Sequence, residues 1–150
     1  NVGKEAGTET YAGFDKLHVS DCANPESASV LRSVEAGHTN MGQIDILCEK
    51  IGATRVFGMD SQAKYAILAA GQSELLFRLI SPKMPDYKEK IWDQAAGSII
   101  VEEAGGRITD LDGKPLNFGL GSTLKENRGV CASNGILHEL TLKSIEEIGA

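Results

Sequence analysis

The stretch of sequence that decides the fold is Lys90-Ile91-Trp92-Asp93-Gln94-Ala95-Ala96-Gly97-Ser98-Ile99-Ile100-Val101-Glu102-Glu103-Ala104-Gly105-Gly106. Four of its apolar residues recur at the spacing of one helix face, namely Ala96, Ile99, Ile100 and Ala104. A separate polar stripe holds Gln94, Ser98 and Glu102. Gly105 is expected to end the helix, because glycine adopts positive φ without a Cβ clash. The stretch therefore predicts an amphipathic helix that begins near Asp93.

This prediction places Asp93 in or just before the first turn of the helix. Unpaired backbone N–H groups and the positive end of the helix dipole favour an ionised carboxylate at that position. Two interpretations follow for its function. Asp93 is either an N-terminal cap of the helix or an oxygen ligand of the kind that Mg²⁺ prefers.

The chain has 150 residues and a formal net charge of −6, which together predict one domain without a large basic surface. Nucleic acid is therefore not expected as a partner, whereas a small anionic ligand needs only a few cations. No apolar run is long enough to cross a membrane, and the N-terminus lacks a signal-peptide pattern. The three cysteines lack metal-binding spacing, so we expect free thiols in a reducing, cytoplasmic compartment. Because the chain begins without Met, an organelle-targeting segment upstream of Asn1 stays open.

Predicted helices and strands alternate along the chain. Helices are expected at residues 24–37, 44–51, 63–70, 93–104 and 136–148. Strands are expected at residues 16–20, 55–59, 74–80, 107–110 and 129–133. This alternation is typical of an α/β fold with a layered sandwich architecture.

Two cations are candidates for binding an anion. Lys64 lies one turn into a predicted helix, three residues after Ser61, so both side chains can face phosphate oxygens at the helix start. The alternative for Lys64 is a solvated surface lysine. Arg78 lies within an otherwise apolar strand, where a buried charge needs an anionic partner. That partner is either a ligand or a carboxylate in a structural ion pair.

A third candidate is His38, which follows Gly37 at the end of the predicted 24–37 helix. Gly37 allows a close approach to the backbone, and the imidazole of His38 offers a flat face that can stack on a base. The alternative is an exposed loop histidine with no role in binding.

Several separate motifs resemble, in the right order, those of the inositol monophosphatase superfamily of Mg²⁺-dependent, lithium-sensitive phosphatases. The resemblance runs from about residue 30 to about residue 135 and rests first on Trp92-Asp93-Gln94-Ala95-Ala96-Gly97 with Glu102-Glu103-Ala104-Gly105-Gly106. Further motifs are closer to the 3′(2′),5′-bisphosphate nucleotidases than to the inositol phosphatases. They are Asp60-Ser61-Gln62-Ala63-Lys64-Tyr65, Phe77-Arg78-Leu79 and Glu89-Lys90-Ile91-Trp92-Asp93.

This resemblance implies hydrolysis of 3′-phosphoadenosine 5′-phosphate to AMP and phosphate, a reaction linked to sulfur assimilation, with the sulfated form PAPS as a further candidate substrate. The substrate-binding residues that it implies are Gly37, His38, Ser61, Lys64, Arg78 and Asp93. The Gly-His pair is expected against the adenosine, and the Ser, Lys and Arg around the nucleotide and its 5′-phosphate. Asp93 is also the implied catalytic residue and the implied ligand of the Mg²⁺ cofactor.

The resemblance also implies the domain organisation. Residues 23–150 are expected to form a C-terminal α/β nucleotide-binding domain, a layered α-β-α sandwich of the inositol monophosphatase-like sugar phosphatase fold. Residues 1–22 are then a loop or strand remnant of the preceding domain. Family members carry most metal ligands in an N-terminal half, on a glutamate-bearing helix and an Asp-Pro-Ile-Asp-Gly-Thr type motif, and this chain contains neither. We therefore expect the isolated chain to be inactive, to need that half as its partner, and to expose an apolar face.

Two alternative functions stay open at this point. The first is an inositol polyphosphate 1-phosphatase, in which the same scaffold holds an inositol ring. The second is a non-catalytic half that assembles with a partner subunit. His18 and His138 match no family motif and are expected at the surface.

Overall fold

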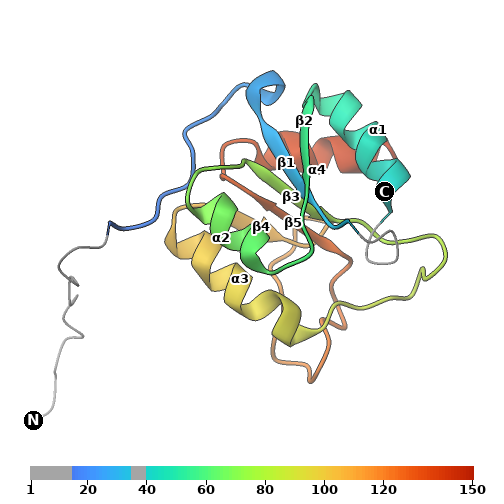
Figure 1. Cartoon of the computed structure of the whole chain (residues 1–150). Coiled ribbons are helices and arrows are strands. Elements are labelled where there is room, and N and C mark those ends of the chain that lie inside the picture. The colour runs from blue at the N-terminus through green and yellow to red at the C-terminus, as the bar shows by residue number, and fades with distance from the viewer. Residues whose placement is uncertain (1–14, 35–39) are drawn as a thin grey trace, which may run out of the picture.

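The computed structural model describes residues 15–34 and 40–150, which form a mixed β-sheet with helices on both faces (Figure 1). The strands are β1 (Ser29–Arg32), β2 (Arg55–Gly58), β3 (Leu75–Arg78), β4 (Arg107–Thr109) and β5 (Val130–Ser133). The α-helices are α1 (Met41–Ile51), α2 (Ala63–Ala69), α3 (Ile91–Glu103) and α4 (His138–Glu147). A short 3₁₀ helix, Pro25–Ser27, precedes β1.

The order of strands in the sheet is β2-β1-β3-β5-β4. Strand β1 pairs in parallel with both β2 and β3, whereas β5 is antiparallel to β3 and β4. Helix α1 connects β1 to β2, and α2 connects β2 to β3, so the chain crosses from one side of β1 to the other. Such a change of direction opens a crevice at the carboxyl ends of the parallel strands, where ligands commonly bind.

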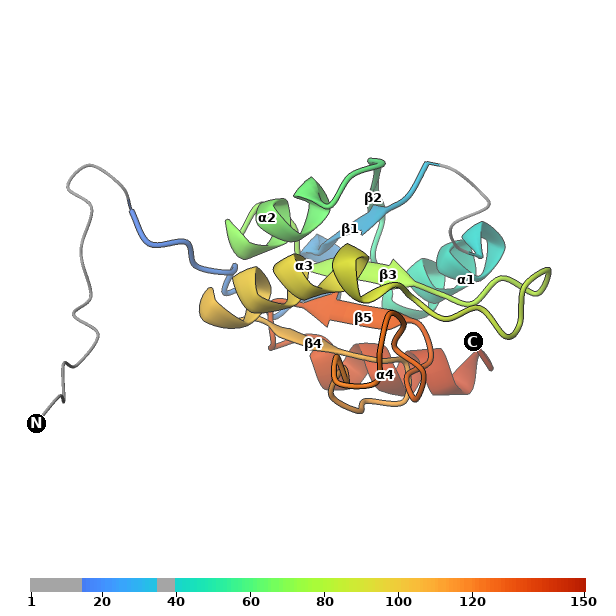
Figure 2. The ribbon, with the colours of Figure 1, turned by 90° about the horizontal axis from the view of Figure 1, so that it is seen from below.

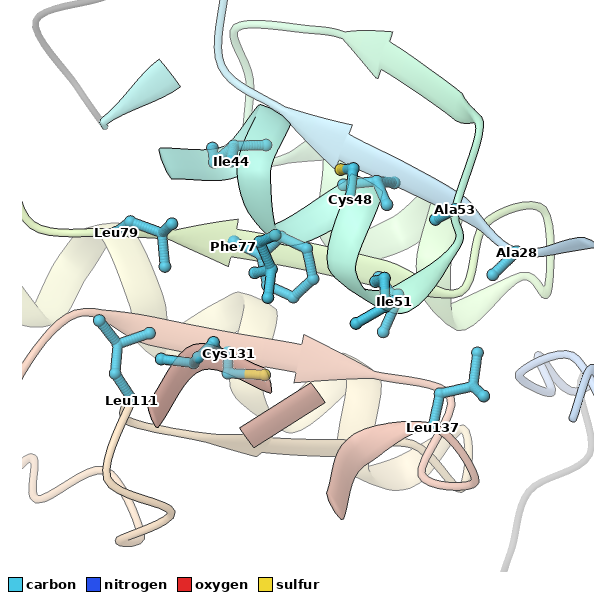
Figure 3. Packing of buried hydrophobic residues seen from close by; sticks show 14 residues of the cluster. Ala28, Ile44, Cys48, Ile51, Ala53, Phe77, Leu79, Leu111, Cys131 and Leu137 are labelled. Atoms are coloured by element: carbon cyan, nitrogen blue, oxygen red, sulfur yellow. The ribbon is translucent and has the colours of Figure 1, made fainter. Parts of the chain in front are cut away.

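The two faces of the sheet carry separate hydrophobic cores. Alternate residues of the central strands point to opposite faces, so Phe77 lies in the core under α1 and α4, and Leu76 lies in the core under α2 and α3. Figure 3 shows Phe77 facing Ile51 of α1 in the first core, and Figure 2 shows the two helix layers on either side of the strands. The architecture is the layered α-β-α sandwich predicted from the sequence.

Helix boundaries follow the capping signals in the sequence. The side chain of Asn40 accepts a hydrogen bond from the backbone N–H of Gln43 at the start of α1. Gly52 ends that helix with a φ of 82°, a left-handed conformation that costs glycine little. Gly71 and Gly105 follow α2 and α3 with φ values of 69° and 88°. The predicted helix ends at these three glycines are therefore confirmed.

Two of the predicted elements near the N-terminus are wrong. Asn24 caps a helical turn as expected, because its side chain accepts from the N–H of Glu26, but the turn is a 3₁₀ helix of only three residues. The chain then enters the sheet as β1, and Val30 is fully buried there between β2 and β3. Burial in a central strand outweighs the helix signal at this place. Residues 16–20, predicted as a strand, join no sheet ladder.

The prediction of which face of α3 is buried is also wrong. The face that α3 buries consists of Gln94, Gly97, Ser98 and Val101. Three large apolar residues of the helix are exposed instead: Trp92 at 59%, Ile99 at 55% and Ile100 at 38%. The helix therefore turns its small and polar residues toward the domain and its large apolar residues outward, so the chain does expose an apolar face.

Residues 18–22 are bound to the domain although they form no strand. The N–H of Val19 donates to the carbonyl of Ala104 at 3.0 Å. The side-chain amide of Asn134 donates to the carbonyls of Ser20 and Cys22, at 3.0 and 2.8 Å. These contacts lie on the N-terminal side of the expected domain boundary at residue 22, which stays a prediction.

The cysteines are free thiols, as predicted from their spacing. Cys48 and Cys131 are buried in the core under α1 and α4. Burial is the largest cause that raises the pKa of Cys48 to about 11 and that of Cys131 to about 12, so both stay protonated at neutral pH. Within residues 15–34 and 40–150, every helix is too short or too polar to cross a membrane.

His138, expected at the surface, is instead completely buried at the start of α4. Its Nδ1 lies 2.8 Å from the hydroxyl of Ser133, and its Nε2 lies 2.9 Å from the hydroxyl of Thr109. The Thr109 hydroxyl donates to the carbonyl of Asp110, so it accepts from His138, and Ser133 donates to Nδ1. A neutral imidazole satisfies this network, which connects α4 with β4 and β5. Burial lowers the pKa of His138 from its ordinary value of 6.5 to about 4.

We predict that the domain loses stability as the pH falls from 6.5 to 4. The unfolded chain binds a proton at His138 near pH 6.5, whereas the folded domain binds it only near pH 4. The neutral side chain of His138 therefore contributes about 3 kcal/mol to the free energy of unfolding above pH 6.5, and this contribution is lost as the pH falls to 4. Urea unfolding measured at several pH values should show that the free energy of unfolding of His138→Gln depends less on pH than that of the wild type. The exposed His18→Gln variant is the control, and an equal flattening there would contradict the assignment.

Candidate functional site

A cavity lies at the carboxyl ends of the three parallel strands. Its volume is about 270 Å³, and its lining residues come from the ends of β1, β2 and β3 and the first turns of α2 and α3. They are Ser33, Asp60, Ser61, Gln62, Lys64, Tyr65, Arg78, Tyr87, Asp93 and Gln94. The cavity is thus placed at the crevice that the strand order creates.

Four of the six residues predicted to bind substrate come together in this cavity: Ser61, Lys64, Arg78 and Asp93. The other two, Gly37 and His38, lie outside the described residues. Sequence reasoning missed the remaining lining residues. Gln94 and Tyr65 stood within the motifs quoted for the family resemblance, but nothing in their spacing indicated a polar contact between them.

Lys64 is buried, so it is not the solvated lysine considered as an alternative. Its ammonium group donates to the carbonyls of Met59 and Ser61, at 2.8 and 3.0 Å. These two bonds hold the turn between β2 and α2 and leave one of the three ammonium hydrogens for another acceptor. Burial, together with the charge of Arg78, lowers the pKa of Lys64, while Asp60 opposes this effect.

Arg78 forms the structural ion pair that was considered as an alternative, and it also lines the cavity. Its Nε and Nη2 donate to the two carboxylate oxygens of Glu89, each at 3.0 Å. The side chains of Arg78 and Glu89 are 15% and 3% exposed. Burial alone would lower the pKa of Arg78, but the carboxylate of Glu89 holds it above its ordinary value. The guanidinium is therefore charged and fixed at the edge of the cavity.

Glu89 is in turn held by a chain of side-chain hydrogen bonds. The amide Nε2 of Gln94 donates to the carboxylate of Glu89 at 2.7 Å. The hydroxyl of Tyr65 donates to the amide oxygen of Gln94. Burial raises the pKa of Tyr65, so its hydroxyl stays protonated as this bond requires. We call Arg78, Glu89, Gln94 and Tyr65 the polar network; it joins β3, α3 and α2 beneath the cavity.

Asp93 lies in the first turn of α3 but is not its N-terminal cap. Lys90 occupies the cap position, without a capping hydrogen bond from its side chain. Within residues 15–34 and 40–150, the carboxylate of Asp93 accepts no hydrogen bond, so it can take a ligand from the cavity. The same residues contain no group of three or more carboxylate, histidine or cysteine side chains that could hold a metal ion. Asp93 alone does not make a metal site.

A second, larger hollow of about 790 Å³ lies between β4, the 111–113 turn and α4. Four of its charged groups are paired with one another, since Arg107 forms an ion pair with Glu139 and Arg128 forms one with Asp112. None of the predicted site residues lines it. The smaller cavity beside Asp93 is therefore the candidate site.

Comparison with known proteins shows which family this arrangement belongs to. The model of the inositol monophosphatase family matches residues 4–150, and the chain belongs to that family. A relative in Schizosaccharomyces pombe named 3′(2′),5′-bisphosphate nucleotidase is 46% identical over 119 residues, which are 79% of this chain and 33% of that protein. A relative of the same name in Oryza sativa is 37% identical over 149 residues, 97% of this chain and 41% of that protein. The predicted resemblance is thereby confirmed.

Solved structures agree with the fold. The IMPase TM1415 of Thermotoga maritima matches with a TM-score of 0.69 and 26% identity, over 91% of this chain and 47% of that one. A staphylococcal IMPase-I, at 19% identity, supports the fold alone, with a TM-score of 0.67 over 92% of this chain and 46% of its own. The chain thus spans less than half the length of the relatives and structures that it matches here.

Helices α2 and α3 pack directly against each other, and Gly97 of α3 is the point of close approach to Tyr65 of α2. A Cβ added at Gly97 would lie 2.3 Å from Cδ2 of Tyr65, well inside contact distance. The ring of Tyr65 is itself fixed by its hydrogen bond to Gln94. The glycine of the Trp92-to-Gly97 motif is therefore required by the approach of these two helices.

We predict that Gly97→Ala destabilises the domain by about 2–3 kcal/mol, because overpacking forces α3 away from α2. The free energy of urea unfolding measures this effect. Gly42→Ala is the matched control: it also lies in a helix, and its added Cβ has no neighbour closer than 3.9 Å. That variant should be neutral or slightly more stable, by about 0.5 kcal/mol. Equal destabilisation of both variants would contradict the role of Gly97.

Proposed function

We propose that the complete protein is a Mg²⁺-dependent 3′(2′),5′-bisphosphate nucleotidase, which hydrolyses 3′-phosphoadenosine 5′-phosphate to AMP and phosphate. The observation that carries this proposal is the cavity that brings Ser61, Lys64, Arg78 and Asp93 together. The names of the curated relatives support the choice of substrate. The sulfated form PAPS, inhibition by lithium and a role in sulfur assimilation belong to the same proposal.

The polar groups of the cavity support distinct roles in this proposal. Lys64 keeps one ammonium hydrogen, and Arg78 keeps the Nη1 hydrogens that Glu89 does not use, so both can donate to the 5′-phosphate. Ser61 lies at the same mouth, and its hydroxyl oxygen already accepts from the N–H of Ala63 at 3.0 Å. The hydroxyl hydrogen of Ser61 is therefore available to donate to the proposed phosphate ligand. The adenosine contacts proposed for Gly37 and His38 fall outside the described residues.

Charge balance supports a role for a metal cation. Among residues 15–34 and 40–150, the carboxylates of Asp60, Asp93 and Glu89 lie in or beside the cavity, together with the cations Lys64 and Arg78. A dianionic phosphate therefore binds well only when further positive charge accompanies it. We propose Asp93 as one oxygen ligand of Mg²⁺, with the other ligands supplied from outside the described residues. The isolated chain is accordingly proposed to be inactive and to need the N-terminal half found in family members.

Two further parts of the proposal concern the compartment of the protein and the kind of ligand that it binds. The free, buried thiols of Cys48 and Cys131 support a reducing location such as the cytoplasm. The net charge of −6 supports a small molecule, and not nucleic acid, as the ligand.

We predict that Asp93→Asn in the complete protein lowers the turnover of 3′-phosphoadenosine 5′-phosphate by about a hundredfold or more, because a charged group at the reacting phosphate is lost. Its thermal unfolding midpoint should not change, since the carboxylate forms no hydrogen bond within the part of the chain that the structure describes. Phosphate release and differential scanning calorimetry measure the two effects. Asp86→Asn, in the exposed loop before α3, is the control. Full activity of Asp93→Asn would contradict the proposal.

The alternatives are separated by two further measurements. An inositol polyphosphate 1-phosphatase would keep full affinity for 3′-phosphoadenosine 5′-phosphate after His38→Ala, whereas a nucleotidase should lose affinity. Phosphate release by this chain alone, with Mg²⁺ present, would contradict the proposal that the remaining ligands are essential. A non-catalytic half would leave turnover of its assembled partner unchanged when Asp93 is replaced.

A further inference from the structure

Arg78 is held in one orientation by a side-on pair with Glu89. Both Nε and Nη2 point to carboxylate oxygens at 3.0 Å, so the plane of the guanidinium is fixed by two parallel bonds. Nη1 is the nitrogen that Glu89 does not engage. Because Arg78 lies at the end of β3 and lines the cavity, the pair determines which nitrogen is available to a ligand.

Glu89 cannot move away from Arg78 without breaking further contacts. Its side chain is 3% exposed, and Gln94, which donates to it at 2.7 Å, is 1% exposed. The amide of Gln94 has one favourable orientation, because its oxygen must face the hydroxyl of Tyr65 and its nitrogen the carboxylate. The backbone carbonyl of Glu89 also accepts from Leu124 at 2.9 Å. The carboxylate is therefore fixed from its side chain and from its backbone.

Glu89 is the carboxylate that neutralises Arg78 at the cavity. The phenol of Tyr87 also lies beside Arg78, and Asp93 lines the same cavity with a negative charge. Without Glu89, the largely buried guanidinium would lose the carboxylate that neutralises its charge and fixes its plane. Arg78 would then be free to leave the orientation in which it faces a ligand.

We propose that Glu89 is a positioning residue for Arg78, supported by Gln94 and Tyr65, and that this polar network gives the site its selectivity for nucleotides with a second phosphate. The proposal rests on the proposed function, since it assigns the 5′-phosphate to Arg78. The proposal predicts that disrupting the polar network lowers kcat/KM for substrates that carry the 5′-phosphate more than for substrates that lack it. A merely structural role would affect all substrates equally.

The test uses the complete protein and two substrates, adenosine 3′,5′-bisphosphate and adenosine 3′-monophosphate, which lacks the 5′-phosphate. The measured quantity is the ratio of kcat/KM for the first to kcat/KM for the second. Glu89→Gln should lower this ratio by about tenfold, as expected when one partner of a buried charge pair is removed. Tyr65→Phe, which keeps the ring and deletes only the hydroxyl, should lower it by about threefold. Glu103→Gln, which changes an exposed acid at the end of α3, is the control and should leave the ratio unchanged.

A double-mutant cycle with Arg78→Lys tests the mechanism. Glu89→Gln should lower the ratio little further in that background, because the residue that it positions is already changed. An unchanged ratio in Glu89→Gln, or equal losses on both substrates, would overturn the proposal. If Glu89→Gln does not fold, the ratio for Tyr65→Phe decides in the same way.

Failure of the proposed function would appear differently, as the absence of turnover by the wild-type protein. The inference is then tested by binding of inorganic phosphate, followed through the fluorescence of Trp92, the one tryptophan of the chain, which adjoins Asp93. Glu89→Gln should weaken phosphate binding about tenfold. Equal affinity in wild type and variant would overturn the positioning role.

Discussion

The burial of one arginine is the constraint on which the arrangement of this domain depends. Arg78 ends a central strand and is only 15% exposed, so its charge must be neutralised by Glu89. Glu89 must then be satisfied from α3, through Gln94, and Gln94 from α2, through Tyr65. Gly97 lets the Tyr65 ring approach closely enough for this. The same contacts that solve an electrostatic problem therefore place α2 and α3 around the cavity.

Local signals in the sequence were sufficient for much of the fold. Glycines that adopt positive φ, such as Gly52 and Gly105, ended the helices where predicted. Alternating strands and helices indicated the layered sandwich. The helix predicted for residues 24–37 was wrong over residues 28–34, where a cap and a proline indicated a helix but the chain forms the inner strand β1. A capping pattern describes only the first turn, and the burial of Val30 depends on strands far away in the sequence.

The candidate site was predictable in part, for a related reason. Single residues whose type is unusual for their place, such as Arg78 in an apolar strand, could be recognised from the sequence, as could Lys64 and Asp93 at predicted helix starts, and the family motifs then implied their roles. Glu89 and Gln94 could not be assigned, because their function follows from contacts with residues up to 29 positions away. Periodicity reports which face of a helix is apolar and contains no information on hydrogen bonds between side chains. His138 was misplaced for the same reason, since a buried network satisfies it.

The wrong prediction for the face of α3 has a physical explanation that concerns the whole protein. Periodicity assigned Ile99 and Ile100 to the interior, yet α3 packs on the domain through Gln94, Gly97 and Ser98. A helix with polar and small residues on its inner side and large apolar residues outside has two faces adapted to burial. Exposing the outer face to water is unfavourable at about 25 cal/mol per Å² of apolar surface. The chain spans 33% to 41% of the two nucleotidases compared above, and the N-terminal half proposed as its partner is the layer that would cover this outer face.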